Sequence, residues 1–260
     1  MKTWKNFLLE ADEGIALVTI NRPEKANSFH LEAFEELALI LEELEKEGSI
    51  RVLILTGAGK NFSAGVDIGL LNQLPTAKAR DFVYSGTELL QKIEKSRKIT
   101  IAAINGPALG GGFILTFPFD VRISSERAFF AITEVAFGVV PTWGGTQRLA
   151  RLVGAGLAKE ILFTGDRFSV EEAYRIGLLN KIVPHDNLIP YCKDLARRIM
   201  ANAPLAVERT KTAINEGLQM PLDQALQYEA ELWLANFYTE DREEGTRSFN
   251  EKRKPNFKGR

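Results

Sequence analysis

Cysteine and histidine are scarce in this sequence, which has one cysteine, Cys192, and two histidines, His30 and His185, in 260 residues. A lone cysteine excludes an intrachain disulfide and suits a reducing compartment. So few thiols and imidazoles also argue against a zinc site or a Cys/His nucleophilic pair. We therefore expect no bound metal. We interpret His30 as a helix-start residue and His185 as a loop residue.

Long apolar runs and an excess of either charge are also missing. No uninterrupted apolar run approaches the about 18 residues that a membrane span needs, and the first residues lack the apolar block of a signal peptide. Lysine and arginine number 33 against 34 aspartates and glutamates, for a net charge of −1. We therefore expect a cytoplasmic protein without a nucleic-acid or membrane partner.

Strand-like and helix-like segments alternate along the first part of the chain. Strands are predicted at Phe7–Glu10, Ile15–Ile20, Arg51–Thr56 and Ile99–Ile104, and helices at Leu31–Lys46 and Ala77–Lys95. Such alternation indicates an α/β domain. The last third favours amphipathic helices at Ala203–Gly217 and Pro221–Tyr238. We therefore predict an α/β core over residues 1–202 and a helical region over residues 203–260.

Two glycine-rich loops, Gly57–Gly65 and Gly106–Gly112, each follow a predicted strand. Neither has the spacing of a phosphate-binding P-loop or of a dinucleotide-binding turn. Taken alone, a glycine triplet is more often a tight turn where backbones pack closely. Two such loops at the ends of neighbouring strands could also aim two backbone N–H groups at one point, which is the geometry of an oxyanion hole.

Glu134 is the only acid in the apolar segment 128–141. Desolvation there would raise the pKa of its carboxyl group, which suits a general base near neutral pH. The alternative is a glutamate in the first turn of a helix, and the residues alone leave both open. Asp120, beside Arg122, is better explained by a structural ion pair or turn.

Taken together, several segments resemble motifs of the enoyl-CoA hydratase/isomerase (crotonase) superfamily. Each motif is modest alone, but their joint order along nearly the whole chain is specific. The matching segments are Phe62–Ile68, Asn105–Gly112, Gly144–Leu149, Leu162–Asp166 and Phe249–Phe257.

The resemblance implies a spiral of ββα units with C-terminal helices that build trimers, often paired as hexamers. It implies a CoA thioester substrate and no cofactor beyond the CoA that the substrate carries. The implied roles are an oxyanion hole from two backbone N–H groups and contacts to CoA. The residues implied for the oxyanion hole are Ala64 and Gly111. Those implied to contact CoA are Lys25, Ala26, Asp67 and Ile68, with Phe249 and Lys252 of a neighbouring subunit.

The sequence departs from the family pattern at a catalytic position. Family hydratases use two glutamates; Glu134 matches the second, whereas Ile114 stands where the first is expected. A single glutamate is the pattern of the family's Δ3,Δ2-enoyl-CoA isomerases, so we place isomerisation slightly ahead of hydration. Thr142 stands where dienoyl-CoA isomerases have an acid. Trp143 lies beside Thr142 in the sequence. Together with Ile114, these two residues suggest a reshaped substrate pocket.

Two alternatives remain open from the sequence. One is an enoyl-CoA hydratase with a one-glutamate site, acting for example on a bulky or cyclic acyl group. The other is a non-catalytic scaffold that binds acyl-CoA or RNA. The absence of a basic stripe interleaved with aromatic residues argues against RNA.

Overall fold

The computed structural model describes residues 4–260, which form two compact units. Of these residues, 4–96 and 100–193 belong to the first unit and 97–99 and 194–260 to the second. The expected division at residue 202 stays a prediction, with residues 1–202 as the part that binds acyl-CoA and residues 203–260 as the oligomerisation region. No helix among residues 4–260 is long and apolar enough to cross a membrane.

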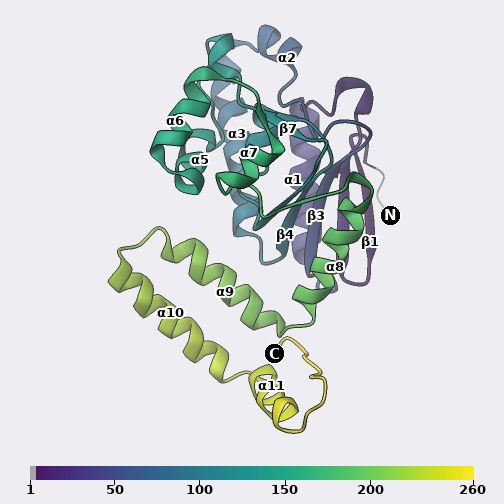
Figure 1. Cartoon of the computed structure of the whole chain (residues 1–260), viewed down its shortest axis with the longest axis vertical. Coiled ribbons are helices and arrows are strands. Elements are labelled where there is room, and N and C mark those ends of the chain that lie inside the picture. Colours follow the sequence, from purple (N-terminus) through teal and green to yellow (C-terminus); the bar gives the residue numbers. More distant parts are fainter. Residues whose placement is uncertain (1–3) are drawn as a thin grey trace. The chain divides into compact units, whose positions relative to one another are not determined.

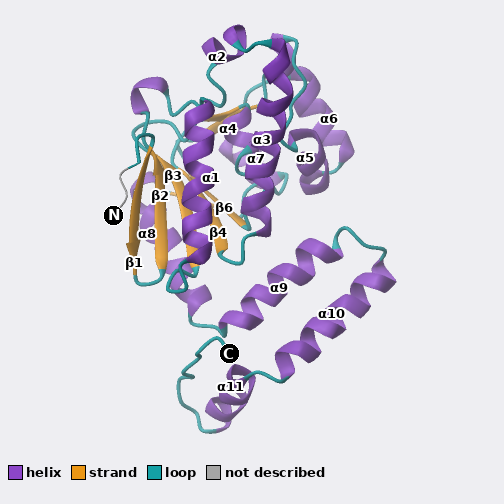
Figure 2. Ribbon diagram, turned by 180° about the vertical axis from the view of Figure 1, so that it is seen from behind, coloured by secondary structure: helices purple, strands orange, loops and turns teal. Residues whose placement is uncertain are grey.

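A six-stranded sheet in the order β1-β2-β3-β4-β6-β9 forms the main layer (Figure 2). β1 and β2 pair antiparallel, whereas β2 with β3, β4 with β6 and β6 with β9 pair parallel. A smaller sheet has the order β5-β7-β8. The strands are β1 (Phe7–Asp12), β2 (Ile15–Ile20), β3 (Val52–Gly57), β4 (Ile99–Ile104), β5 (Ala108–Leu109), β6 (Val121–Ser125), β7 (Phe129–Ala131), β8 (Phe168–Ser169) and β9 (Lys181–Val183).

Helices follow most of the strands (Figure 1). The α-helices are α1 (Leu31–Lys46), α2 (Ile68–Gln73), α3 (Thr76–Lys95), α4 (Gly111–Ile114), α5 (Gly145–Val153), α6 (Ala155–Thr164), α7 (Val170–Arg175), α8 (Leu188–Met200), α9 (Pro204–Gly217), α10 (Leu222–Phe237) and α11 (Glu240–Asn250). Short 3-10 helices lie at Pro23–Lys25, Glu134–Phe137 and His185–Asn187. This mixed architecture confirms the predicted α/β class.

Helix α1 shows why the apolar spacing predicted its position. Its apolar residues recur every three or four positions, and Phe34, Leu37 and Leu41 are buried on that face. The His30 Nδ1 atom accepts a hydrogen bond from the Ala33 N–H at 3.1 Å and so caps the first turn. The predicted bounds of this helix and the interpretation of His30 as a helix-start residue are both confirmed.

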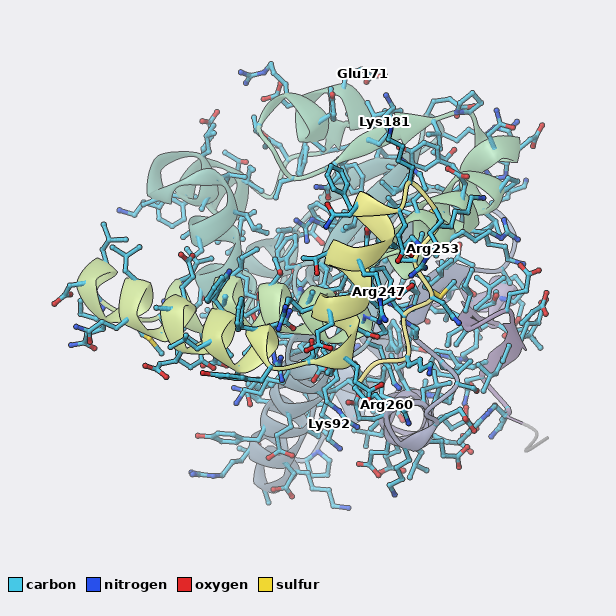
Figure 3. All side chains as sticks on the ribbon, turned by 90° about the horizontal axis from the view of Figure 1, so that it is seen from below. Lys92, Glu171, Lys181, Arg247, Arg253 and Arg260 are labelled. Atoms are coloured by element: carbon cyan, nitrogen blue, oxygen red, sulfur yellow. The ribbon has the colours of Figure 1, made fainter. Side chains whose placement is uncertain are left out.

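The second unit contains α9, α10 and α11, and its C-terminal segment folds back on α11. Arg253 binds Glu244 through both terminal nitrogens, at 2.6 and 2.9 Å, and Figure 3 labels this arginine. Buried Asp241 accepts hydrogen bonds from the N–H groups of Lys258 and Gly259 at 2.6 and 2.8 Å. Bidentate charge-assisted bonds of this kind are strong. The two carboxylates therefore hold the segment in place.

Candidate active site

The loop after β3 is held by two asparagine side chains. The Asn105 Oδ1 atom accepts from the Gly57 N–H at 3.0 Å, and its Nδ2 donates to the Gly59 oxygen at 3.1 Å. Asn27 Nδ2 donates to the oxygens of Ala58 and Asn61 at 2.9 and 2.7 Å. These side-chain amides form hydrogen bonds with backbone N–H and C=O groups that have no strand partner in the irregular loop. The loop is therefore fixed at the ends of β3 and β4.

The two glycine loops meet at Gly65. A Cβ on Gly65, whose φ is +86°, would lie 2.7 Å from the Leu109 oxygen and 3.1 Å from the Gly111 nitrogen. Only glycine fits both this conformation and this contact. The structure therefore brings together the two loops that the sequence singled out.

Ala64 and Val66 differ in how their N–H groups are used. The Ala64 N–H donates to the Ala26 oxygen at 2.9 Å, so the fold already uses this amide. Val66 forms a parallel β-bridge with Phe29. The two hydrogen bonds of this bridge run from the Phe29 N–H to the Gly65 oxygen and from the Asp67 N–H to the Phe29 oxygen. The Val66 N–H takes no part in this bridge and therefore points to the opposite edge of the segment.

Glu134 begins the short 3-10 helix Glu134–Phe137 and lies against the glycine triplet. A Cβ on Gly110 would lie 2.8 Å from Glu134 Oε1 and 3.4 Å from Oε2. Oε2 is buried and, among residues 4–260, has no hydrogen-bond partner. Burial raises the pKa of Glu134, and its own backbone amide and that of Gly111 oppose this increase. The carboxyl group and the Gly111 amide are therefore direct neighbours.

The three residues expected to reshape the pocket lie close to this point, but two of them are core residues. Ile114 is 1% exposed and Trp143 is 3% exposed, whereas Thr142 is half-buried. A Cβ on Gly145 would lie 2.7 Å from Ile114 Cδ1, so this isoleucine packs on the start of α5. Ile114 and Trp143 therefore have very little solvent-exposed surface. A lining role for the three residues stays a prediction.

Four of the residues expected to contact CoA lie on two adjoining segments. Lys25 ends the 3-10 helix Pro23–Lys25 and is exposed, and Ala26 follows it with a φ of +49°. Asp67 donates its N–H to the Phe29 oxygen at 2.9 Å, and its Oδ1 caps α2 through the Gly69 N–H. Ile68 is the first, exposed residue of α2. The pairing of the two segments thus gathers these four residues.

The other two expected CoA contacts belong to the second unit. Phe249 lies near the end of α11 and is 83% exposed. Lys252 follows the helix, is also exposed, and has a φ of +55°. Their assignment to a neighbouring subunit's CoA stays a prediction.

Other ionisable candidates have structural roles. Asp120 Oδ2 accepts from the N–H and hydroxyl of Thr100 at 2.7 and 3.0 Å. Buried Arg122 donates to the oxygens of Leu178 and Phe119 at 2.8 and 2.7 Å, and burial lowers its pKa to about 10. Burial also raises the pKa of Cys192 to about 12, which leaves it protonated at neutral pH. Asp120 and Arg122 are therefore engaged in hydrogen bonds within the fold, and Cys192 is not a ready nucleophile.

His185 supports the loop rather than the chemistry. Its Nδ1 lies 3.1 Å from the Asn105 oxygen and 3.3 Å from Ser125 Oγ. It begins the 3-10 helix His185–Asn187, not an irregular loop as expected. The ring therefore braces the turn after β4.

A buried carboxyl group beside two converging glycine loops has the chemical groups that acid/base chemistry on a carbonyl compound requires. The profile of the enoyl-CoA hydratase/isomerase family matches residues 10–260. The chain belongs to this family and is an enzyme, as the motifs predicted.

Named relatives are similar over almost their whole length. The chain is 42% identical to the short-chain-enoyl-CoA hydratase of Clostridium acetobutylicum over 96% of each chain. It is also 42% identical to the crotonyl-CoA hydratase of Syntrophomonas wolfei over 98% of each chain. The crystal structure of an enoyl-CoA hydratase from Bacillus anthracis matches with a TM-score of 0.95 at 39% identity, over 98% of this chain and 100% of that one. The predicted crotonase-like fold is thereby confirmed.

Two residues near these groups were not singled out from the sequence: Val66, and Gly86 of α3, where a Cβ would lie 2.2 Å from Trp143 Nε1. No composition signal marks the Val66 amide, because its direction depends on the bridge to Phe29. Gly86 carried a signal, since a glycine inside a helical pattern indicates close packing or function.

Proposed function

We propose that this enzyme moves the double bond of a 3-enoyl-CoA to the 2-position, with Glu134 as its single acid/base. The observation that supports this most is the pairing of one buried carboxyl group, Glu134, with the Gly111 amide, while buried Ile114 stands where the first of the two family glutamates is expected. An isoleucine can neither activate water nor donate a proton. A double-bond shift needs only one group that removes a proton and returns it.

The oxyanion donors we propose are the N–H groups of Gly111 and Val66. The sequence-based choice of Ala64 is replaced, because that amide donates to Ala26. The thioester oxygen would take the place of the Glu134 carboxylate at the Gly111 N–H and accept from Val66 as well. Each such donor contributes roughly 3–4 kcal/mol to transition-state stabilisation in known cases.

The reaction then needs only the transfer of one proton from C2 to C4 and no other reactant. The Glu134 carboxylate removes a proton from C2, and the electron pair passes into a dienolate whose oxygen is held by the two N–H groups. Protonated Glu134 returns the proton at C4, and the double bond comes to rest between C2 and C3. The raised pKa of Glu134 favours this exchange, because a general acid/base works best when its pKa lies near the working pH.

A second candidate is hydration of a 2-enoyl-CoA, favoured by the two hydratases that are 42% identical to this chain. Purified enzyme should be incubated separately with 3-enoyl-CoA and 2-enoyl-CoA, and the products separated by chromatography. Formation of 2-enoyl-CoA from the first substrate is expected. Conversion of 2-enoyl-CoA to its 3-hydroxy product, with no reaction of 3-enoyl-CoA, would replace the first proposal with the second.

Restoring a carboxylate at position 114 tests whether its absence disfavours hydration. Ile114→Glu should increase the ratio of hydration to isomerisation, because it adds a group that can orient water. Ile114→Gln is the matched control, since it introduces a similar shape without a carboxylate. Melting temperatures show whether both variants fold, as burial of a polar group beside Gly145 costs stability. An unchanged ratio in a folded Ile114→Glu variant would contradict this explanation.

For CoA, we propose contacts from Lys25, Ala26, Asp67 and Ile68. The support is their exposure or half-burial on two segments joined by the bond from Ala64 to Ala26 and by the bridge at Phe29. An exposed lysine offers a charge for a phosphate group. Phe249 and Lys252 are proposed to approach the CoA of a neighbouring subunit.

We further propose that α9 and α10 build a homotrimer or a hexamer. These consecutive helices pack on each other (Figure 1). They leave large apolar side chains exposed. The exposed residues include Ile214, Leu218, Leu222, Leu226 and Trp233. Many large apolar side chains exposed on one pair of helices favour an interaction site.

Light scattering coupled to size exclusion should therefore give a mass of three or six times 29.0 kDa. Leu222→Asp combined with Leu226→Asp should shift the mass to that of smaller species, because it places charges on the apolar face. Gln224→Asp, at an exposed position on α10, is the control and should leave the mass unchanged. A monomeric wild type would overturn the proposal.

A further inference from the structure

We propose that Trp143 is a positioning residue for the Gly111 amide, and that Gly86 in α3 sets the place of the indole. The inference rests on the proposed function, because it gives Trp143 a role in aiming a proposed oxyanion donor. In this role the buried Trp143 side chain acts through Gly111.

The indole is enclosed by two helices. Its ring centroid lies 4.8 Å from that of Phe34 in α1 and 5.3 Å from that of Phe82 in α3, both in edge-on geometry. The buried Nε1 atom has no hydrogen-bond partner among residues 4–260. Because the indole N–H has no partner, the position of the ring is set by packing and not by a hydrogen bond. The unpaired buried N–H itself lowers stability.

Gly86 makes that position possible. A Cβ on Gly86 would lie 2.2 Å from Trp143 Nε1 and 2.4 Å from Cε2. Glycine in a helix interior costs about 1 kcal/mol relative to alanine, and α3 keeps it in the middle of 20 residues. The close approach of the indole is the physical reason that this position in the helix is occupied by glycine.

The opposite edge of the indole supports the glycine triplet. A Cβ on Gly111 would lie 2.6 Å from Trp143 Cζ3 and 3.5 Å from Val66 Cγ2. Gly111 therefore has the indole on one side and Val66, which carries the other proposed donor, nearby. A movement of the ring along its long axis would change the place of the Gly111 backbone.

The backbone of Trp143 is strained and clamped. Its φ is +56°, a region that costs a non-glycine residue of order 1–3 kcal/mol and is enriched at functional sites. Arg148 Nη1 donates to the Trp143 oxygen at 2.9 Å, and Arg148 Nη2 lies 2.6 Å from Glu94 Oε2 in α3. α3 thus holds both the ring, through Gly86, and the backbone, through Glu94.

The test is a double-mutant cycle on Gly86 and Trp143 in the full-length enzyme. Gly86→Ala places a methyl group where the indole lies and should displace the ring toward Gly111. We expect kcat to fall roughly 10- to 100-fold, as a displacement of about 1 Å can cost 10²-fold, with a much smaller change in KM. Trp143→Phe should also lower kcat, because it removes the support under Gly111.

The double variant should be less impaired than the product of the two single effects, because the smaller phenyl ring would leave room for the alanine methyl group. Gly156→Ala in α6 is the matched control, since a Cβ there meets no atom within 4 Å. It should keep full activity. Multiplicative single effects, or a folded Gly86→Ala variant with wild-type kcat, would overturn the proposal.

A spectroscopic readout separates positioning from general stability. A conjugated dienoyl-CoA absorbs at longer wavelength when its thioester oxygen is polarised by hydrogen bonds, so its shift on binding reports the donors directly. The shift should shrink in Gly86→Ala and Trp143→Phe and persist in Gly156→Ala. An equal shift in all variants, or none in the wild type, would overturn the positioning role. An unreactive wild type that still shows the shift pattern would overturn only the proposed function.

Discussion

Glu134→Gln should lower kcat roughly 10²–10⁴-fold, the usual contribution of a general acid/base. The amide keeps the size of the side chain but can neither remove the C2 proton nor return it at C4. The rate of 2-enoyl-CoA formation from 3-enoyl-CoA measures the effect. Glu160→Gln, an exposed position in α6, is the matched control and should react at the wild-type rate. Near-wild-type turnover in Glu134→Gln would remove this residue from the mechanism.

The pH dependence gives a second signature of the same carboxyl group. Only the ionised form acts as a base, and burial raises its pKa. The acid limb of kcat/KM should therefore lie above the ordinary glutamate range of about 4.3–4.5. A limb at the ordinary value would contradict the desolvation of Glu134.

Stability should respond to pH in the opposite sense to activity. Because the pKa of Glu134 is higher in the folded than in the unfolded protein, the wild type loses stability as pH rises through the interval between the two values. Glu134→Gln lacks this loss. Its melting temperature should exceed that of the wild type above the interval, and the difference should close below it.

Val66→Pro should lower kcat roughly 10²–10³-fold, as expected for the loss of one oxyanion donor. Proline removes the N–H, and the bridge to Phe29 does not use that group. The fold should therefore tolerate the change better than its effect on activity suggests. Initial rates and melting curves measured together separate the two effects.

Val66→Ala is the control, because it shortens the same side chain and keeps the N–H. Ala64→Pro offers the complementary comparison, since it breaks the bond from Ala64 to Ala26 and should mainly reduce stability. Equal activities of Val66→Pro and Val66→Ala, with both folded, would eliminate the Val66 amide as a donor.

Much of the fold was predictable because the relevant forces are local in the sequence. The apolar period over Leu31–Lys46 and the apolar run Ile99–Ile104 predicted elements with the bounds that the structure has. The bounds of the four-residue helix α4 were not predicted, and the two-residue strands β5 and β8 were missed. Such segments are formed by their pairing partners and not by their own pattern.

The sequence alone determined the family, the place of Glu134 and the two glycine loops, because these follow from the order and identity of residues. Only the tertiary structure decided which amides of the loops are available. The Ala64 N–H is used by Ala26, whereas the bridge to Phe29 leaves that of Val66 unused. It also decided that Trp143 is a core residue behind Gly111, because the space beside Gly86 comes from helix packing. Amide direction and side-chain burial depend on contacts between distant segments, which no local pattern contains.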